Sequence, residues 1–366
     1  MYALDLFAGV GWGVACKELG IEEYGVENDP HVIGTRSIND MRTIYADVWT
    51  GLHKPELVPA HDILIASPPC QTYSVAGNGA GREALDQVLS LVKNKVYHEG
   101  YNIQNITSRL NFDDRTALVL APLAYVSRHR PKYVVMEQVP TVLPVWEAFA
   151  EEMREMGYSV WTGHLHAEQY GVPQTRKRAF LIARRDGEEA QPPVPTHSKY
   201  HTRNPDKLDD GLPFWVSMAE ALGWTEDDTR EMVSNYSNNG DAAVKGTRDS
   251  SQPSPTVTGK VGRNKWRINN QSGGASDAEW THKRPAPTIA GRGLVPAPGA
   301  NANRFNGSTK SRNDGINVTI EEAAILQSFP ENFKWETGSV KTANFQIIGN
   351  AVPPLLAKII LKNFMN

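Results

Sequence analysis

The feature that most constrains the fold is an alternation of short apolar runs with helix-like stretches along the first half of the chain. Most of the apolar runs lack a polar face, which is typical of strands that are covered on both sides. The pattern therefore predicts an α/β fold, with helices on both faces of an open sheet. The expected strands are Tyr2–Phe7, Glu23–Glu27, Asp62–Ala66, Tyr133–Glu137, Tyr158–Leu165 and Arg178–Ala183, and the expected helices are Val14–Leu19, Ala117–His129 and Val145–Met156.

The alternation stops near Gln191–Pro195, and from there to about Phe333 the chain is rich in Gly, Asn, Ser, Pro and Thr. This composition predicts a second, smaller, loop-rich β domain with one helix at about Val216–Leu222. The last helix-like stretch, Leu355–Phe364, resembles the first half again. We therefore expect a first domain over residues 1–192, a second over 193–336, and a segment over 337–366 that returns to the first domain.

Charge is distributed unevenly along the chain. The whole chain has a net charge of -3, but residues 240–312 contain 12 Lys and Arg against 4 Asp and Glu. A basic segment on an acidic body is typical of a polyanion-binding module joined to a catalytic domain. A solvated basic surface is the alternative.

Composition excludes several classes of protein. The chain has 366 residues, 40% of them hydrophobic, and only two cysteines, Cys16 and Cys70. Two cysteines exclude a disulfide scaffold and a cysteine zinc site, and they indicate a reducing, cytoplasmic location. No apolar run approaches the roughly 18 residues of a membrane helix, and a strand-like stretch follows Met1 with no room for a signal peptide.

Polar and glycine residues follow the first strands, where α/β sheets bind ligands. Asp5-Leu-Phe-Ala-Gly-Val-Gly-Trp-Gly13 predicts a strand, a tight turn and a helix start. Glu27 ends the second strand at the spacing of a ribose-binding carboxylate, and Asp47 follows a third short strand, where it could contact an adenine amino group. Alone, the glycine pattern fits a structural turn equally well, but with Glu27 it favours a nucleoside site.

Three further segments carry candidate chemistry. Cys70 lies in Ser67-Pro-Pro-Cys-Gln-Thr-Tyr73, directly after a strand, which suits a nucleophilic thiol better than a buried one. Glu137 ends another strand, where it can act as an acid or as a helix cap. Gln174-Thr-Arg-Lys-Arg178 places Arg176 and Arg178 on one face of a strand, to hold an anion or a carbonyl oxygen or to face solvent.

Taken in chain order, these segments resemble the motif series of the cytosine-C5 DNA methyltransferases of bacterial or phage type. The resemblance implies a Rossmann-like sheet that binds S-adenosylmethionine, and a target-recognition domain over about 193–317, the basic region. The segments that carry it are Asp5–Gly9, Glu27, Pro69-Cys-Gln71, Glu137-x-Val139, Tyr170-Gly-Val-Pro-Gln-x-Arg-x-Arg178, Val318–Pro330 and Gly349-Asn-Ala-Val-Pro-Pro354.

The resemblance also implies roles for single residues. Cys70 would attack cytosine C6, Glu137 would protonate or bind N3, and Arg178 would hold O2. Arg176 would hold a phosphate or Glu137, and Gln71 is a further implied catalytic residue. Double-stranded DNA is the implied partner, a monomer is expected, no metal is implied, and S-adenosylhomocysteine is the implied product. A companion restriction endonuclease is compatible with the family. The implied donor-binding residues are Asp5, Phe7, Ala8, Gly9, Gly11, Glu27, Asn28, Asp47, Pro69, Asn350 and Ala351.

Three departures from the family pattern stand out. Trp12 replaces a common glycine, Gln138 replaces the usual Asn after the catalytic Glu, and residues 88–113 form a longer span than usual. Three other functions remain open at this point. They are a tRNA cytosine methyltransferase of the same fold, a DNA-binding protein with an inactive core, and a dinucleotide oxidoreductase, which the glycine turn alone suggests.

Overall fold

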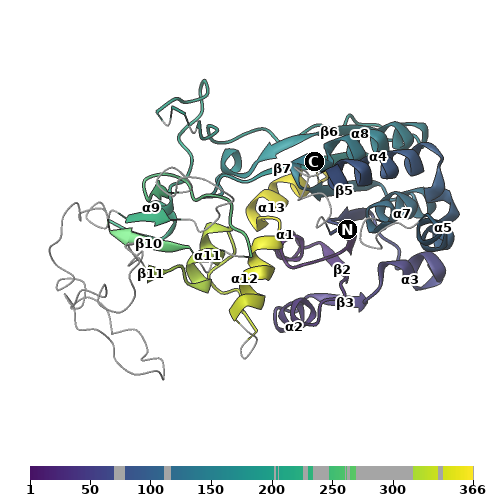
Figure 1. Cartoon of the computed structure of the whole chain (residues 1–366), viewed down its shortest axis with the longest axis horizontal. Helices are drawn as coiled ribbons and strands as arrows, with labels where there is room; N and C mark the ends of the chain where they lie inside the picture. The colour runs from purple at the N-terminus through teal and green to yellow at the C-terminus, as the bar shows by residue number, and fades with distance from the viewer. Residues whose placement is uncertain are drawn as a thin grey trace.

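The computed structural model describes residues 1–69, 79–110, 117–201, 203–204, 206–225, 230–233, 247–259, 261, 264–268, 316–336 and 341–365. Figure 1 shows a larger part, which contains both chain ends, and a smaller part built around a second sheet. Cys70, Gln71 and most of the basic segment lie outside the described residues.

The larger part is built on a seven-stranded sheet in the order β3-β2-β1-β4-β5-β7-β6. All neighbours pair in parallel except β7, which runs antiparallel to both β5 and β6. The strands are β1 (Tyr2–Leu6), β2 (Glu22–Val26), β3 (Arg42–Tyr45), β4 (Ile63–Ala66), β5 (Tyr133–Gln138), β6 (Ser159–His166) and β7 (Lys177–Arg184). This sheet confirms the predicted α/β, Rossmann-like fold, and each of the six listed strand predictions overlaps an observed strand.

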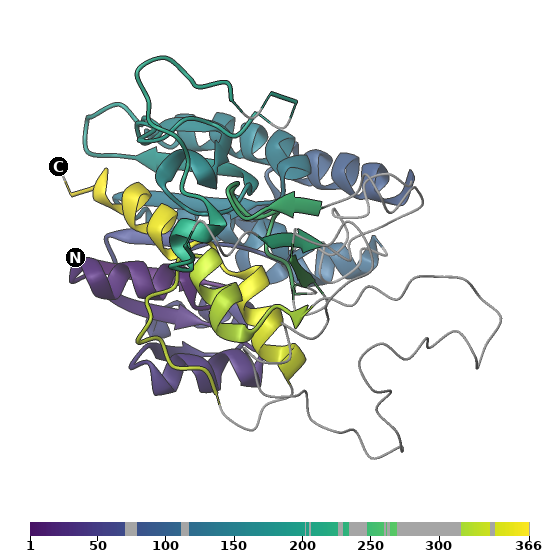
Figure 2. The same ribbon diagram turned by 90° about the vertical axis from the view of Figure 1, so that its left-hand side faces the viewer.

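Alternating side chains divide the core between the two faces of the sheet. Leu4, Leu6 and Leu64 share one apolar cluster, whereas Ala3 and Ile63 share another. The first cluster includes residues of α3 (Val48–His53), α4 (Gly79–Lys93), α5 (Ile103–Arg109), α7 (Ala121–His129) and α8 (Leu143–Glu155). The second includes residues of α1 (Gly11–Leu19) and α13 (Pro354–Lys362). The C-terminal helix therefore covers the same face as the first helix, and Figures 1 and 2 show the two close together.

Short helical segments connect these elements. The 3-10 helices are η1 (Pro55–Leu57), η2 (Val96–Asn102), η3 (Leu118–Leu120), η4 (Pro140–Val142) and η5 (Ala167–Tyr170). The predicted helix Ala117–His129 is divided between η3 and α7, and α7 starts with a proline in its first turn.

The smaller part has an antiparallel four-stranded sheet in the order β11-β10-β8-β9. Its apolar cluster includes Met232, Trp266 and Phe329 together with Val14 of α1, so the two parts share a packed junction. The predicted helix at Val216–Leu222 is the shorter α9 (Met218–Ala221). The other elements here are β8 (Arg230–Val233), β9 (Thr247–Asp249), β10 (Lys265–Ile268), β11 (Ile316–Asn317) and α11 (Ile320–Leu326).

One described stretch, Thr342–Lys362, is long and apolar enough to cross a membrane, but 72% of its most apolar window is buried. It consists of two helices, α12 (Lys341–Asn350) and α13, separated by Ala351–Pro353. Both helices contribute buried residues to the clusters described above, which is the behaviour of core helices.

A fully buried arginine joins β2 and β3 to the turn between β1 and α1. Arg36, from α2 (Pro30–Ile38), pairs with Glu23 at 2.8 Å. Its guanidinium also donates to the carbonyls of Gly9 and Arg42 and to the hydroxyl of Thr43. These partners satisfy a charge that would otherwise be costly to bury.

We expect Arg36→Met to lower the free energy of unfolding by about 3–5 kcal/mol, because it leaves the Glu23 carboxylate buried without its partner. Lys17→Met is the matched control. It breaks the Lys17–Asp40 pair, whose side chains are 60% and 84% exposed, and should change stability little. Denaturant unfolding at pH 7 measures both, and equal midpoints for the two variants would contradict the prediction.

Candidate active site

The carboxyl ends of β1, β2, β4 and β5 meet at one edge of the sheet, and the predicted site residues of these strands lie there. Phe7 follows β1, Glu27 follows β2, Ser67–Pro69 follow β4, and Glu137 is the second-last residue of β5. Pro69 is the last described residue before Cys70. The strand ends therefore bring these side chains to the edge where such sheets bind ligands.

The turn after β1 is closed by Glu27. One carboxylate oxygen accepts from the Gly9 amide at 3.1 Å, and the other accepts from the amides of Asn28 and Asp29, both at 2.9 Å. Phe7 and Gly9 have φ values of 60° and 53°, a left-handed backbone that is uncommon for phenylalanine. The Cβ position of Gly9 meets no atom within 4 Å. The turn is thus fixed by backbone donors and leaves open space above Gly9.

The C-terminal turn packs against the start of α1. A Cβ on Gly11 would lie 2.0 Å from the carbonyl oxygen of Val352, so only glycine fits there. Asn350 ends α12 and is exposed, whereas Ala351 is buried and its carbonyl accepts from the Gln327 side chain at 2.6 Å. The glycine turn and the Gly349–Pro354 turn, far apart in the sequence, are therefore in direct contact.

We expect Gly11→Ala to weaken binding of the methyl donor at least about tenfold, because a new Cβ against a backbone carbonyl must move one of the two turns. Gly34→Ala is the matched control: there a new Cβ meets the end of the Glu336 side chain, which can move away. Isothermal titration with S-adenosylmethionine measures both variants. Unchanged affinity in Gly11→Ala would show that the contact between the turns does not shape the donor site.

Two other residues that are predicted to bind the methyl donor, Asp47 and Asp5, differ in environment. Asp47 caps α3, accepts from the Trp49 amide at 3.0 Å and remains exposed. Asp5 is fully buried, and neither of its carboxyl oxygens has a hydrogen-bond partner among the described residues. Burial raises the pKa of Asp5 well above its ordinary value, the charge of Glu23 raises it further, and Arg36 partly offsets this. Open space at Gly9 and exposed carboxylate at Asp47 fit a nucleoside-containing donor.

Glu137 and Arg178 form a largely buried ion pair at this sheet edge. The Arg178 Nε lies 3.2 Å from a Glu137 oxygen, and the Glu137 side chain is only 7% exposed. Burial raises the pKa of Glu137, while the charges of Arg178 and Arg176 partly offset this effect. Burial thus favours the protonated form of this carboxyl, which is the form that can give a proton to a bound base.

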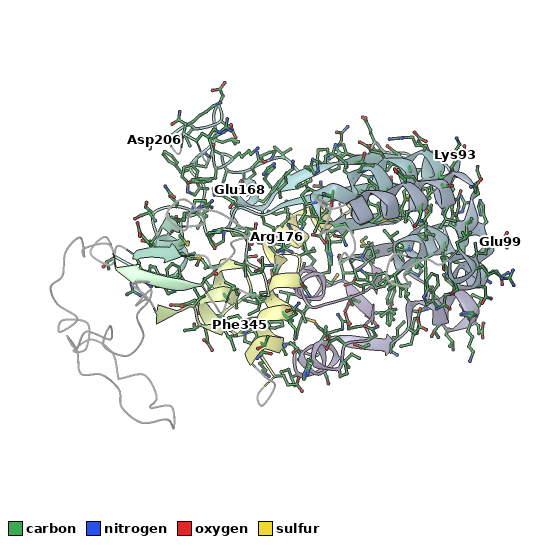
Figure 3. The ribbon with its side chains drawn as sticks, viewed as in Figure 1. Lys93, Glu99, Glu168, Arg176, Asp206 and Phe345 are labelled. Atoms are coloured by element: carbon green, nitrogen blue, oxygen red, sulfur yellow. The ribbon has the colours of Figure 1, made fainter. Side chains whose placement is uncertain are left out.

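Arg176 takes a different position from Arg178. It lies one residue before β7 and is buried, and its carbonyl accepts from the Ala167 amide at 2.9 Å. Its guanidinium donates to the carbonyls of Val257 and Gly349, at 3.2 and 3.0 Å. Figure 3 shows Arg176 where the C-terminal helices approach the first sheet. Arg176 thus joins three segments of the chain.

A buried glutamine pair adds to the same junction, and sequence reasoning missed it. Gln174 donates to Gln327 and to the Leu326 carbonyl, and it accepts from the Val257 amide at 2.9 Å. Gln327 in turn donates to the carbonyls of Ile348 and Ala351. Glutamines separated by 153 positions carry no local signal that they pair.

The family model for C-5 cytosine-specific DNA methylases matches residues 1–93 and 105–366. The chain belongs to this family. It is a DNA cytosine-5 methyltransferase, and methyltransferases of this family use S-adenosylmethionine. Residues 94–104, which the family model leaves unmatched, fall within the long span over 88–113 and form mostly η2.

Curated relatives are similar over almost the whole methyltransferase chain. Type II methyltransferase M1.HphI of Haemophilus parahaemolyticus is 27% identical, covering 98% of this chain and 84% of the relative. Type II methyltransferase M.AplI of Arthrospira platensis is 25% identical, covering 99% and 85%. Among solved structures, Spodoptera frugiperda DNMT2 has a TM-score of 0.55 at 17% identity, covering 100% of this chain and 99% of that one, which supports the fold.

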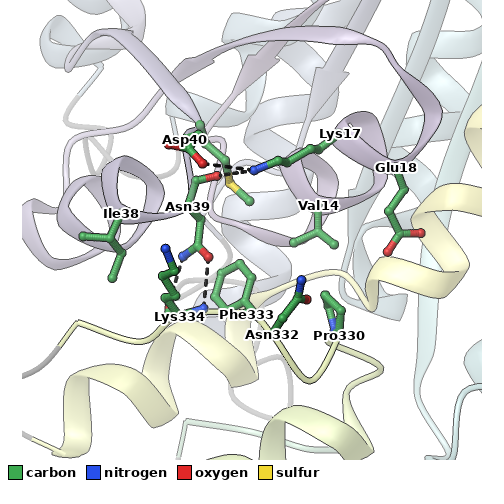
Figure 4. A pocket seen from close by; sticks show the side chains of 11 residues that line it. Val14, Lys17, Glu18, Ile38, Asn39, Asp40, Pro330, Asn332, Phe333 and Lys334 are labelled. Atoms are coloured by element: carbon green, nitrogen blue, oxygen red, sulfur yellow. Dashed lines mark hydrogen bonds and ion pairs between the residues drawn. The ribbon is translucent and has the colours of Figure 1, made fainter.

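The methyltransferase also has a cavity away from this sheet edge. It has a volume of about 440 Å³ and lies beside Lys17 and Glu18 of α1, opposite Pro330–Lys334 (Figure 4). Asn39 exchanges two hydrogen bonds with the Lys334 backbone across it. The cavity lies at the C-terminal end of α1. The glycine turn leads into the N-terminal end of the same helix, so the cavity is separate from the turn.

Proposed function

We propose that the enzyme methylates a cytosine flipped out of a specific sequence in double-stranded DNA, through a covalent bond between the Cys70 sulfur and C6 of the base. The observation that carries this proposal is the buried Glu137–Arg178 pair at the same sheet edge where Ser67–Pro69 lead toward Cys70. Groups at this edge can contact the ring carbons of a base only after the base has left the stack.

Each proposed catalytic group has one task. The Cys70 thiolate bonds to C6, which breaks the aromaticity of the ring and makes C5 nucleophilic. Glu137 holds a proton at N3, so that the ring does not accumulate negative charge, and Arg178 holds O2 and orients Glu137. After C5 has been methylated, loss of its proton expels the thiolate and restores the ring. Gln71 is the residue after the nucleophile. Arg176 holds the segments of Val257 and Gly349 in place through hydrogen bonds to their carbonyls.

We assign the methyl donor to the edge formed by the two contacting turns. S-adenosylmethionine supplies an electrophilic methyl group when bound and leaves as S-adenosylhomocysteine, and the mechanism needs no metal. Among the described residues, no group of three or more His, Cys, Asp or Glu could hold a metal ion. The proposed donor contacts are Asp5, Phe7, Ala8, Gly9, Gly11, Glu27, Asn28, Asp47, Pro69, Asn350 and Ala351.

The basic region is the proposed DNA-binding part. We divide the chain into a catalytic domain over 1–192, a target-recognition domain over 193–336 and a returning segment over 337–366. Lys and Arg of residues 240–312 would neutralise phosphates and read base edges. We further propose a cytoplasmic monomer. The type II names of the curated relatives support a companion restriction endonuclease.

The test supplies the full chain with labelled S-adenosylmethionine and either mixed-sequence duplex DNA or tRNA. We expect label only in the DNA, at C5 of cytosines within one short sequence, which sequencing of the methylated cytosines identifies. Label in tRNA but not in DNA would replace this function with the RNA alternative. Label on the exocyclic nitrogen of cytosine would overturn the mechanism.

A further inference from the structure

Two of the residues that depart from the family pattern contact the same short segment. Trp12 donates from its indole Nε1 to the Ser67 hydroxyl at 3.1 Å. Gln138 donates from its side-chain amide to the Pro68 carbonyl, and its side-chain oxygen accepts from the Val139 amide. Trp12 starts α1 and Gln138 ends β5, so Ser67–Pro69 are held from two sides.

This segment has only one backbone donor of its own, the Ser67 amide. The β4 ladder ends at Ala66, and the last backbone donor before Cys70 is the Ser67 amide, which bonds to the Leu6 carbonyl at 3.2 Å. Pro68 and Pro69 have no amide hydrogen. The other groups that can form hydrogen bonds here are the Ser67 hydroxyl and the backbone carbonyls. Trp12 donates to the hydroxyl, and Gln138 donates to the Pro68 carbonyl.

The indole is rigidly placed. Trp12 is 1% exposed and belongs to the apolar cluster that also contains Ile65, Val352 and Leu356. An indole can only donate a hydrogen bond, and a buried donor without a partner is costly, so packing and hydrogen bonding favour the same orientation. The side chain is thus turned into the core, where it links α1 to the end of β4.

We propose that Trp12 is a positioning residue which, together with Gln138, fixes Ser67–Pro69 so that the following Cys70 meets the base at the correct place relative to Glu137. The proposal rests on the proposed role of Cys70 as the nucleophile. Catalysis is sensitive to displacements of this kind, because small errors in the approach of the reacting atoms reduce the rate of bond formation. Trp12 acts on the chemical step and leaves donor binding unchanged.

The test compares Trp12→Phe, Ser67→Ala and the double variant in single-turnover methylation of a duplex that contains the recognised sequence. Phenylalanine removes the donor and keeps an aromatic ring in the core, although it is smaller than the indole. We expect each single variant to slow the chemical step about 3- to 10-fold, the size of one net hydrogen bond, with unchanged affinity for S-adenosylmethionine. Because both changes remove the same bond, the double variant should be no slower than the slower single variant.

Tyr158→Phe is the matched control. It removes another buried hydrogen bond to a carbonyl, from the Tyr158 hydroxyl to Pro131 at 2.6 Å, at the opposite edge of the sheet. It should lower the melting temperature, as any lost buried hydrogen bond does, while leaving the rate of the chemical step unchanged. Equal rates for Trp12→Phe, Ser67→Ala and Tyr158→Phe would overturn the proposal, as would additive losses in the double variant.

A second readout separates this proposal from the proposed function. If the wild-type enzyme forms no stable adduct with 5-fluorocytosine DNA, the role of Cys70 is wrong. If the wild-type enzyme forms the adduct and Ser67→Ala forms it equally fast, the positioning role alone is wrong. Should Trp12→Phe fail to fold, Ser67→Ala still decides the outcome, because Ser67 is only half-buried.

Discussion

Cys70→Ser should abolish the stable adduct with 5-fluorocytosine DNA and lower kcat by more than about 1,000-fold, because a serine hydroxyl is a much weaker nucleophile than a thiolate at neutral pH. Fluorine at C5 cannot leave as a proton does, so an enzyme that bonds to C6 remains attached to the DNA. Denaturing electrophoresis of the enzyme with the fluorinated duplex and S-adenosylmethionine measures the adduct directly.

The other cysteine of the chain provides the control. Cys16 is 0% exposed, and burial raises the pKa of its thiol well above the ordinary value, so it remains a protonated core residue. Cys16→Ala should lose some stability and retain the adduct. A stable adduct in Cys70→Ser, or loss of the adduct in a folded Cys16→Ala enzyme, would show that Cys70 is not the nucleophile.

Local patterns predicted the elements of the sheet well, because buried strands and their polar ends are written in contiguous residues. The six listed strand predictions overlap observed strands. Glu27 and Glu137 lie at the carboxyl ends of their strands, as the pattern predicted. Arg176 lies one residue before β7, and its charge acts on Glu137 as that of Arg178 does. Its hydrogen bonds to two carbonyls of distant segments were not indicated by the local pattern.

Contacts between distant residues account for what the sequence did not provide. The sequence marked Trp12 and Gln138 only as departures from the family pattern. Their common partner segment lies 55 and 70 positions away and became visible only in the fold. Likewise, nothing near Gln174 in the sequence indicates that it bonds to Gln327. A motif therefore predicts which residues matter better than it predicts what they touch.

Glu137→Gln should lower kcat about 100- to 1,000-fold, because the amide can occupy the same place beside Arg178 but has no acidic proton for N3. In the wild-type enzyme, kcat should fall as pH rises through the raised pKa of Glu137, since the protonated form is lost there. Glu137→Gln should lack this alkaline fall. Glu168→Gln is the matched control: Glu168 is also buried, lies 3.6 Å from His166 (Figure 3 labels it) and should leave both kcat and its pH profile unchanged.

The same substitution should affect stability in the opposite direction. Because burial raises the pKa of Glu137 in the folded state, folding favours its protonated form. Stability from this group is complete below the pKa of an unfolded glutamate and is lost as pH rises through the folded-state pKa. Glutamine has no such loss, so the melting temperature of Glu137→Gln relative to wild type should increase with pH across that window. A constant difference would show that folding does not raise the pKa of Glu137, and then a bound base would have to draw its N3 proton from another group.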